Sequence, residues 1–369
     1  MVLEGSWDWY SISRNISISD VYDNPYETWN RGGLSKNKDI TIDLIHNLSL
    51  PHTTGDWDWF YISENISISE VYKYPDETWN RGGLSWNENL TIDLIHNLVL
   101  PRATNIWNWY PISKYIRVSE VYKYPDKTWN RSGLSQNKGI SIDLIHRLRL
   151  PNSTDDWDWC SISEYISISE VYKRRYQTWN KEGLSQNKDI SIDLIHNLAL
   201  SRSSSVWNWY YISQNISISE VYKYPDEPWD KEGLSINKDL SIDLIHNLEL
   251  PNATSNWDWY YISWNISIPE VYKYLDETWD IDGLSLNKNI TIDLVYNREL
   301  HEAIGDWDIF LISMNTSITN VCRYIDKSWD RQGLSANKNL TIDDIYRLDH
   351  RPRYDYRRYT ISFSDIVII

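Results

Sequence analysis

Apolar and polar residues alternate along this chain in a pattern that repeats every 50 residues. Within each copy a Trp is followed five residues later by Ile or Leu, and the same spacing recurs at a second Trp 22 residues on. Position Trp+6 is Ser in all fourteen half-copies. A fixed period of this kind predicts a stacked array of related units. The half-copies begin at Trp7, Trp29, Trp57, Trp79, Trp107, Trp129, Trp157, Trp179, Trp207, Trp229, Trp257, Trp279, Trp307 and Trp329.

The later part of each half-copy has the pattern of a short capped helix. Ser17 with Asp20, and Ser67 with Glu70, have the spacing of a capping box, as do the Ser167/Glu170 and Ser217/Glu220 pairs. In the other half Thr41 precedes an acidic first turn and an apolar stripe. Prolines that follow these segments, such as Pro25 and Pro51, predict their ends.

The earlier part, from Trp7 to Ser13, is long enough for about two helical turns. We expect Asn15 or Asn37 to end such a helix in the left-handed conformation. A Gly occupies Trp+4 in every second half-copy, beginning with Gly33. Because Gly is unfavourable inside a helix, its recurrence predicts close approach by a neighbouring backbone.

These elements predict an all-α fold, an α-solenoid of about fifteen short helical hairpins. Stacked at ~9–10 Å, the hairpins form a rod or superhelix of roughly 130–150 Å. Residues 1–349 make the tandem-repeat solenoid, and residues 350–369 a degenerate terminal repeat or cap in which Tyr354 replaces Trp. A β-solenoid is the alternative, because Ile16-Ser-Ile-Ser alternates with period two.

Charge and composition narrow the functional classes. The net charge is −16, which disfavours binding to a phosphate backbone, so no nucleic-acid partner is expected. The chain shows no signal peptide and no apolar run of the ~18 residues that a membrane helix needs. Two cysteines, Cys160 and Cys322, form no framework or metal spacing. We therefore expect a cytoplasmic protein with no membrane association.

The pattern Trp-x-x-x-x-(Ile/Leu)-Ser-x-Asn, followed by (Ile/Leu)-(Thr/Ser), resembles the tryptophan-rich tandem-repeat proteins of large DNA (giant) viruses. The match runs from Trp7 to about Leu348. Two departures are Ile309, where other copies have a second Trp, and Arg117 at a capping Ser. The resemblance implies a viral repeat array, in host cytoplasm, and no particular activity.

Recurring Asp and His residues are the strongest candidates for chemistry. Asp43 and His46 lie three residues apart and share a helix face, as do the pairs 93/96, 143/146, 193/196 and 243/246. Such a pair suits a metal or acid–base site. However, Tyr296 and Tyr346 fill the His position, and Tyr is a poor replacement for a metal-binding His. A structural ladder is therefore the favoured interpretation, with no catalytic, metal or cofactor residue.

Candidate partner contacts lie where copies differ. Trp86 and Trp264 occupy Trp+7, where eight of the other twelve half-copies carry Lys, Arg, Gln or Glu. The only basic patch comprises Arg351, Arg353, Arg357 and Arg358, for which capping is favoured over binding. The sequence thus predicts a non-catalytic scaffold for unknown protein partners. A structural virion component and, less favoured, an Asp/His enzyme are the alternatives, and the oligomeric state is left open.

Overall fold

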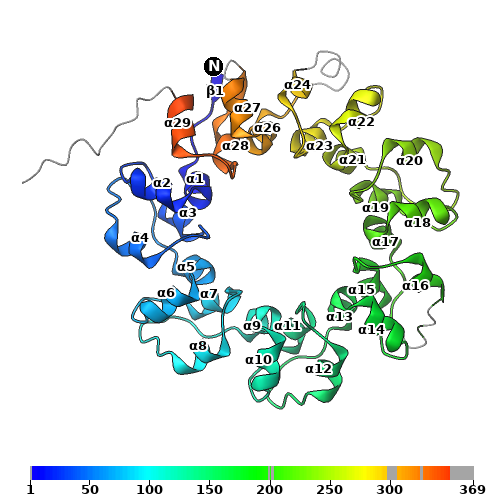
Figure 1. Ribbon diagram of the computed structural model, residues 1–369, viewed down its shortest axis with the longest axis horizontal. Helices are drawn as coiled ribbons and strands as arrows, with labels where there is room; N and C mark the ends of the chain where they lie inside the picture. The colour runs from blue at the N-terminus through cyan, green and yellow to red at the C-terminus, as the bar shows by residue number, and fades with distance from the viewer. Residues whose placement is uncertain (1, 198–199, 201–202, 297–305, 325–326, 350–369) are drawn as a thin grey trace, which may run out of the picture.

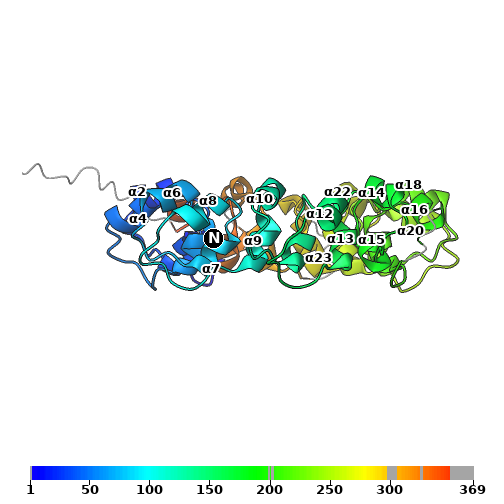
Figure 2. The same ribbon diagram turned by 90° about the horizontal axis from the view of Figure 1, so that it is seen from below.

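The protein is a flat, closed ring of short helices. The computed structural model describes residues 2–197, 200, 203–296, 306–324 and 327–349. Figure 1 looks down the ring axis, and Figure 2 shows the ring edge-on. The first helix of each half-copy lies on the inner side and the second helix on the outer side (Figure 1). The all-α solenoid of helical hairpins predicted from the sequence is therefore confirmed for the described residues.

The inner helices of the described residues run in chain order around the ring axis. They are α1 (Trp9–Asn15), α3 (Arg31–Ser35), α5 (Trp59–Asn65), α7 (Arg81–Trp86), α9 (Trp109–Tyr115), α11 (Arg131–Ser135), α13 (Trp159–Tyr165), α15 (Lys181–Gln186), α17 (Trp209–Asn215), α19 (Lys231–Ile236), α21 (Trp259–Asn265), α23 (Ile281–Leu286), α26 (Ile309–Asn315) and α28 (Arg331–Ala336).

The outer helices and two short strands complete the described elements. They are α2 (Ile18–Asp23), α4 (Ile42–Asn47), α6 (Ile68–Lys73), α8 (Ile92–Asn97), α10 (Val118–Lys123), α12 (Ile142–Arg147), α14 (Ile168–Lys173), α16 (Ile192–Asn197), α18 (Ile218–Lys223), α20 (Ile242–Asn247), α22 (Ile268–Lys273), α24 (Ile292–Val295), α27 (Ile318–Arg323), α29 (Ile342–Leu348), β1 (Val2–Glu4) and β2 (Ser328–Asp330).

The Trp-x4-(Ile/Leu) spacing is explained by how each inner helix starts. Trp7 and Trp29 do not begin helices, because each stands one residue before the N-cap. The N-cap Asn30 accepts a hydrogen bond from Gly33 N–H through its side chain. An apolar residue before the N-cap and another at the fourth helical position form a hydrophobic staple. Trp29 and Leu34 occupy these two positions, and both are fully buried.

Two local predictions about caps are wrong. Helices do begin after Ser67, Ser167 and Ser217, but none of these side chains makes a capping hydrogen bond. Two of the carboxylates expected at N3 reach the preceding copy instead: Ile42 N–H donates to Glu70 at 3.3 Å, and Ile192 N–H donates to Glu220 at 2.7 Å. The reciprocal capping box is formed in α29, at its N-terminus.

The expected left-handed Asn is the second correction. Asn15 ends α1 within the helix, and Asn37 is buried. The Asn37 amide donates to Ser13 O and Ile16 O, so it satisfies carbonyls at the end of α1. Left-handed residues occur elsewhere in the described chain, in the connection between copies, at Gly5, Gly55, Asn105, Asp155, Ser205 and Ser255.

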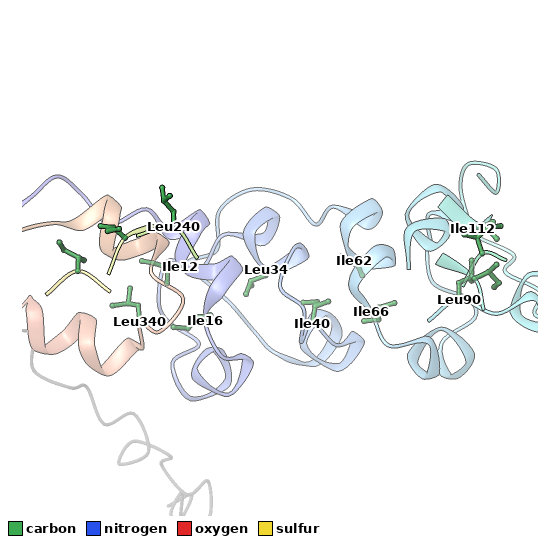
Figure 3. Packing of buried hydrophobic residues seen from close by; sticks show 14 of the residues in the cluster. Ile12, Ile16, Leu34, Ile40, Ile62, Ile66, Leu90, Ile112, Leu240 and Leu340 are labelled. Atoms are coloured by element: carbon green, nitrogen blue, oxygen red, sulfur yellow. The ribbon is translucent and has the colours of Figure 1, made fainter. Parts of the chain in front are cut away.

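Tryptophan forms the centre of each copy. Trp129 is fully buried, and its indole N–H donates to Tyr124 O at 2.8 Å. Trp109 packs edge-to-face against it, with ring centroids 5.4 Å apart. Around these pairs the aliphatic core continues from copy to copy. Figure 3 follows it from Leu340 of the last copy past Ile16 and Ile40 of the first to Ile66 of the second. The second Trp of each copy is buried as predicted, whereas the first Trp is only partly buried in the first six copies and packs against the core.

A buried serine joins each half-copy to the next. Ser13 Oγ accepts the backbone N–H of Asn30, and Ser35 Oγ accepts that of Asp58. The same bond recurs at every half-copy boundary, with N···O distances of 2.8–3.3 Å. The last bond of the series runs from Asp8 N–H to Ser335 Oγ, which links the first half-copy to the last. The series is therefore circular, without an end.

Contacts between the first and last copies close the solenoid into a ring, where a rod or superhelix was expected. Helix α1 packs against α28, and β1 pairs in parallel with β2. Glu4 faces Asp330 in this pairing, as Thr54 faces Asn30 in an interior copy. The place on α28 that a fifteenth unit would take is occupied by α1. Residues 350–369, predicted as that unit or cap, lie outside the described residues.

The predicted close approach at the recurring Gly is confirmed, and it gives a stability prediction. A Cβ on Gly83 would overlap the Phe60 carbonyl oxygen and lie 3.0 Å from Ser63 Cβ. We expect Gly83→Ala to lower the free energy of unfolding by about 1–3 kcal/mol, the usual cost of overpacking, as measured by urea unfolding. Gly82→Ser is the matched control, because Ser132 fills that position in the next copy. Equal loss in both variants would contradict the prediction.

Candidate functional site

The recurring Asp and His residues bind the next copy rather than each other. Tyr74 Oη donates to Asp43 Oδ1 at 2.7 Å, and this hydrogen bond lowers the pKa of the Asp43 carboxyl. His46 Nε2 lies 3.1 Å from Glu77 Oε1. Among the described residues, no group of three or more His, Cys, Asp or Glu side chains is placed to hold a metal ion. The arrangement is a ladder of contacts between outer helices.

The contact between this position and the next copy is kept in several copies, with different residues. His196 contacts Glu227 and His246 contacts Glu277. Where Tyr296 replaces His, the ammonium of Lys327 lies 4.4 Å from the Tyr ring centroid. At the seam between the last and first copies, Tyr346 Oη donates to Glu27. The position thus serves packing between copies, which explains why Tyr can replace His there in the last two copies.

In copy two, Lys127 stands at the position that Glu77 has in copy one, so a cation faces His96. This exchange predicts a measurable shift in the pKa of His96. Burial, with repulsion from Lys127, lowers the pKa of His96. We expect Lys127→Glu to raise it, since a carboxylate faces His46 in copy one. NMR titration of the His96 ring measures the change. An unchanged His96 pKa in Lys127→Glu would refute this prediction.

The lowered pKa of His96 also determines how the stability of the protein depends on pH. Because the folded-state pKa of His96 lies below its ordinary value, the unfolded chain binds the proton more tightly. The contribution of neutral His96 is complete above its ordinary pKa and is lost as pH falls through the lowered folded-state pKa. The Lys127→Glu variant should therefore lose less stability over that pH range.

The Trp+7 residues lie at the ends of the inner helices and vary from copy to copy. Trp86 is half-buried, and its ring lies 6.1 Å from that of Tyr115. Trp264 is 42% exposed and lies 6.2 Å from Tyr261. The two predicted contact residues are seven half-copies apart, on α7 and α21, so the fold does not bring them together. Their partner-binding role stays a prediction.

Five consecutive Trp+7 residues on neighbouring helices form an apolar arc. Trp264 is its most exposed member, and the others are half-buried. Their helices pack in succession from α19 to α28. The arc consists of Ile236, Trp264, Leu286, Met314 and Ala336. The remaining Trp+7 residues are polar or charged apart from Trp86: Arg14, Lys36, Glu64, Trp86, Lys114, Gln136, Glu164, Gln186 and Gln214.

Sequence reasoning missed the arc because its members are 22 or 28 residues apart. Only alignment of the half-copies, together with the order of the packed helices, shows that they are neighbours. The predicted Arg cluster, Arg351, Arg353, Arg357 and Arg358, lies outside the described residues. Within the described part of the chain, no helix is long and apolar enough to cross a membrane.

The geometry defines a closed seven-copy ring of helical repeats with variable side chains at the inner-helix ends. No protein-family model, curated protein or solved structure matches the chain. Any functional statement must therefore come from these residues.

Proposed function

We propose that this protein is a non-catalytic scaffold that binds a polypeptide partner along the apolar arc. The proposal rests on the difference between the buried positions of the repeat, which are constant, and the partly exposed Trp+7 position, which varies. Trp, Ser and Gly recur at the buried positions that build every copy, whereas the partly exposed Trp+7 position varies and becomes apolar over one continuous sector. Contiguous exposed apolar surface marks interaction sites more often than it occurs on inert surfaces.

Charge beside the arc indicates the chemistry of the partner. Lys238, Lys288 and Lys338 each follow an arc residue by two positions and are exposed. An apolar strip next to a row of lysines is complementary to a segment that carries apolar and acidic side chains. Trp264 supplies the large aromatic anchor that usually dominates such an interface.

The resemblance to tryptophan-rich repeats of large DNA viruses supports a viral source as part of this proposal. A cytoplasmic location belongs to it as well, because Cys160 and Cys322 are both free thiols. No nucleic-acid backbone is expected as partner, given the net charge of −16.

A comparison of matched variants tests the scaffold. Trp264→Gln with Leu286→Gln removes the arc, using the residue that Gln214 and Gln186 place at the same position. Gln136→Ala with Gln186→Ala is the control outside the arc. Affinity capture with quantitative mass spectrometry should show proteins that the wild type and the control retain and the arc variant loses. Direct binding of one such purified protein, weakened about tenfold or more by the arc substitutions, supports the proposal. Retention of the same proteins by the arc variant would overturn it.

A further inference from the structure

An open hollow with an excess of basic side chains spans the seam of the ring. Its volume is about 750 Å³, and it lies between the end of α1, the loop after α3, the start of copy two and the loop after α28. Figure 1 shows that α1 and α28, which come from opposite ends of the chain, lie side by side at the seam. Its charged lining comprises Arg14, Lys36, Lys38 and Lys338, together with the carboxylates Asp39 and Glu64.

The other copies show which of these charges are part of the framework. A hollow of about 720 Å³ occupies the equivalent place before copy five. It keeps the two loop lysines, Lys188 and Lys238, but has Gln214 in place of Arg14 and Ile236 in place of Lys36. No other copy has basic residues at all four equivalent positions. The additional charges are therefore specific to the seam, in a chain whose net charge is −16.

Packing positions one of these cations, and the others are available to a ligand. The Lys36 ammonium lies 4.1 Å from the Tyr61 ring centroid and 5.5 Å from that of Tyr10. The hydrogen bond with Tyr10 raises the pKa of Lys36, so the ammonium stays charged at neutral pH. Within the described residues, Arg14, Lys38 and Lys338 have no carboxylate within ion-pair distance.

We propose that the seam hollow binds a compact polyanion, a di- or triphosphate group. Arg presents a planar fork that matches phosphate oxygens, and Lys supplies point charges around them. Four cations against two carboxylates leave an excess that one clustered anion neutralises. A long polyanion is disfavoured, because it would extend over the acidic remainder of the surface.

Binding at this place links the first and last copies. Lys338 belongs to copy seven, whereas Arg14, Lys36 and Lys38 belong to copy one. A ligand that contacts both sides favours the closed ring and raises its thermal stability by mass action. None of the five arc residues lines the hollow, and Lys338 is the one residue that both the hollow and the row of lysines beside the arc contain.

Isothermal titration calorimetry of the full chain with inorganic tripolyphosphate tests the proposal. We expect one saturable site per chain, weakened by added salt, and a rise in melting temperature. Orthophosphate should bind at least about tenfold more weakly, since it spans fewer of the four cations. A nucleoside triphosphate distinguishes the source: equal affinity indicates recognition of the phosphates alone, and tighter binding indicates an added base contact.

The chain supplies matched variants for both loss and gain of the site. Arg14→Gln with Lys36→Ile installs the residues of copy five and should weaken tripolyphosphate binding about tenfold or more. The converse graft is Gln214→Arg with Ile236→Lys and Asp189→Asn, the last because the seam has Asn339 there. The grafted Lys then has Tyr210 and Tyr261 as neighbours, the counterparts of Tyr10 and Tyr61. We expect the graft to bind a second tripolyphosphate.

Each result of these titrations either supports or overturns the proposed site. One site lost in the seam variant and a second site gained in the graft would establish the ligand class and its location. Absence of saturable binding to the wild type, unchanged affinity in the seam variant, or a graft that stays at one site would each overturn the proposal. Every introduced residue occurs naturally at an equivalent position of another copy, so we expect each variant to fold. Circular dichroism of each variant checks this.

Discussion

Cysteines introduced as Val2→Cys and Ser328→Cys should form an intramolecular disulfide bond under mild oxidation. Val2 and Ser328 are directly paired residues of β1 and β2, and paired strand residues have the Cα separation that a disulfide spans. The bond closes a loop of most of the chain, so the chain-entropy account predicts a stabilisation of roughly 5–6 kcal/mol. Both native cysteines are first replaced by Ser to prevent other pairings.

Gel mobility without reductant and the urea midpoint with and without reductant measure this result. Val2→Cys with Thr128→Cys is the control, because Thr128 occupies the same position of copy three, on another part of the ring. The control pair should stay reduced or link different chains. An open rod separates residues 2 and 328 by nearly the whole array, so failure of the first pair to form would contradict ring closure.

Trp129→Ala should cause the largest stability loss of any single truncation considered. Trp129 is fully buried, its indole donates to Tyr124 O, and Trp109 packs on its ring. Truncating a buried Trp costs about 3–5 kcal/mol. Because stability in a repeat array depends on neighbouring copies, amide hydrogen exchange should show the loss concentrated in copies two to four.

The control for this truncation is Trp264→Ala. Trp264 is 42% exposed and belongs to the apolar arc, so its removal should change the urea midpoint little. The two variants thus separate framework tryptophan from contact tryptophan. Similar destabilisation by both substitutions would contradict the assignment of Trp264 to a binding surface.

The Asp and His residues show how much of the candidate site the sequence alone can predict. Asp43 and His46 were recognisable as a repeated pair, and the Tyr at position 296 already indicated packing rather than metal binding. Their actual partners, Tyr74 and Glu77, belong to the next copy. Spacing within a helix cannot identify them, because the contact depends on how far one copy rotates relative to the next.

The seam residues show the same limit more sharply. Lys338 and Arg14 are far apart in sequence. Neither is unusual when it is compared with the residues at the equivalent positions of other copies. They line one hollow only because the ring closes. The Arg residues at 351–358 are recognisable as a basic patch because they are close together in the sequence, whereas the charges of the hollow are distributed over distant segments.

By itself the sequence determined the 50-residue period, the short helices, the buried Trp and the glycine at each tight backbone contact. These follow from local rules: staple spacing, helix propensity and the steric size of a side chain. The tertiary structure decided the closed ring, the partners of Asp and His, and the positions that face one another at the seam. The physical reason is that a small rotation at each buried Ser-to-backbone junction accumulates over seven copies into one full turn. That rotation is set by packing between copies, which no pattern within a single copy encodes.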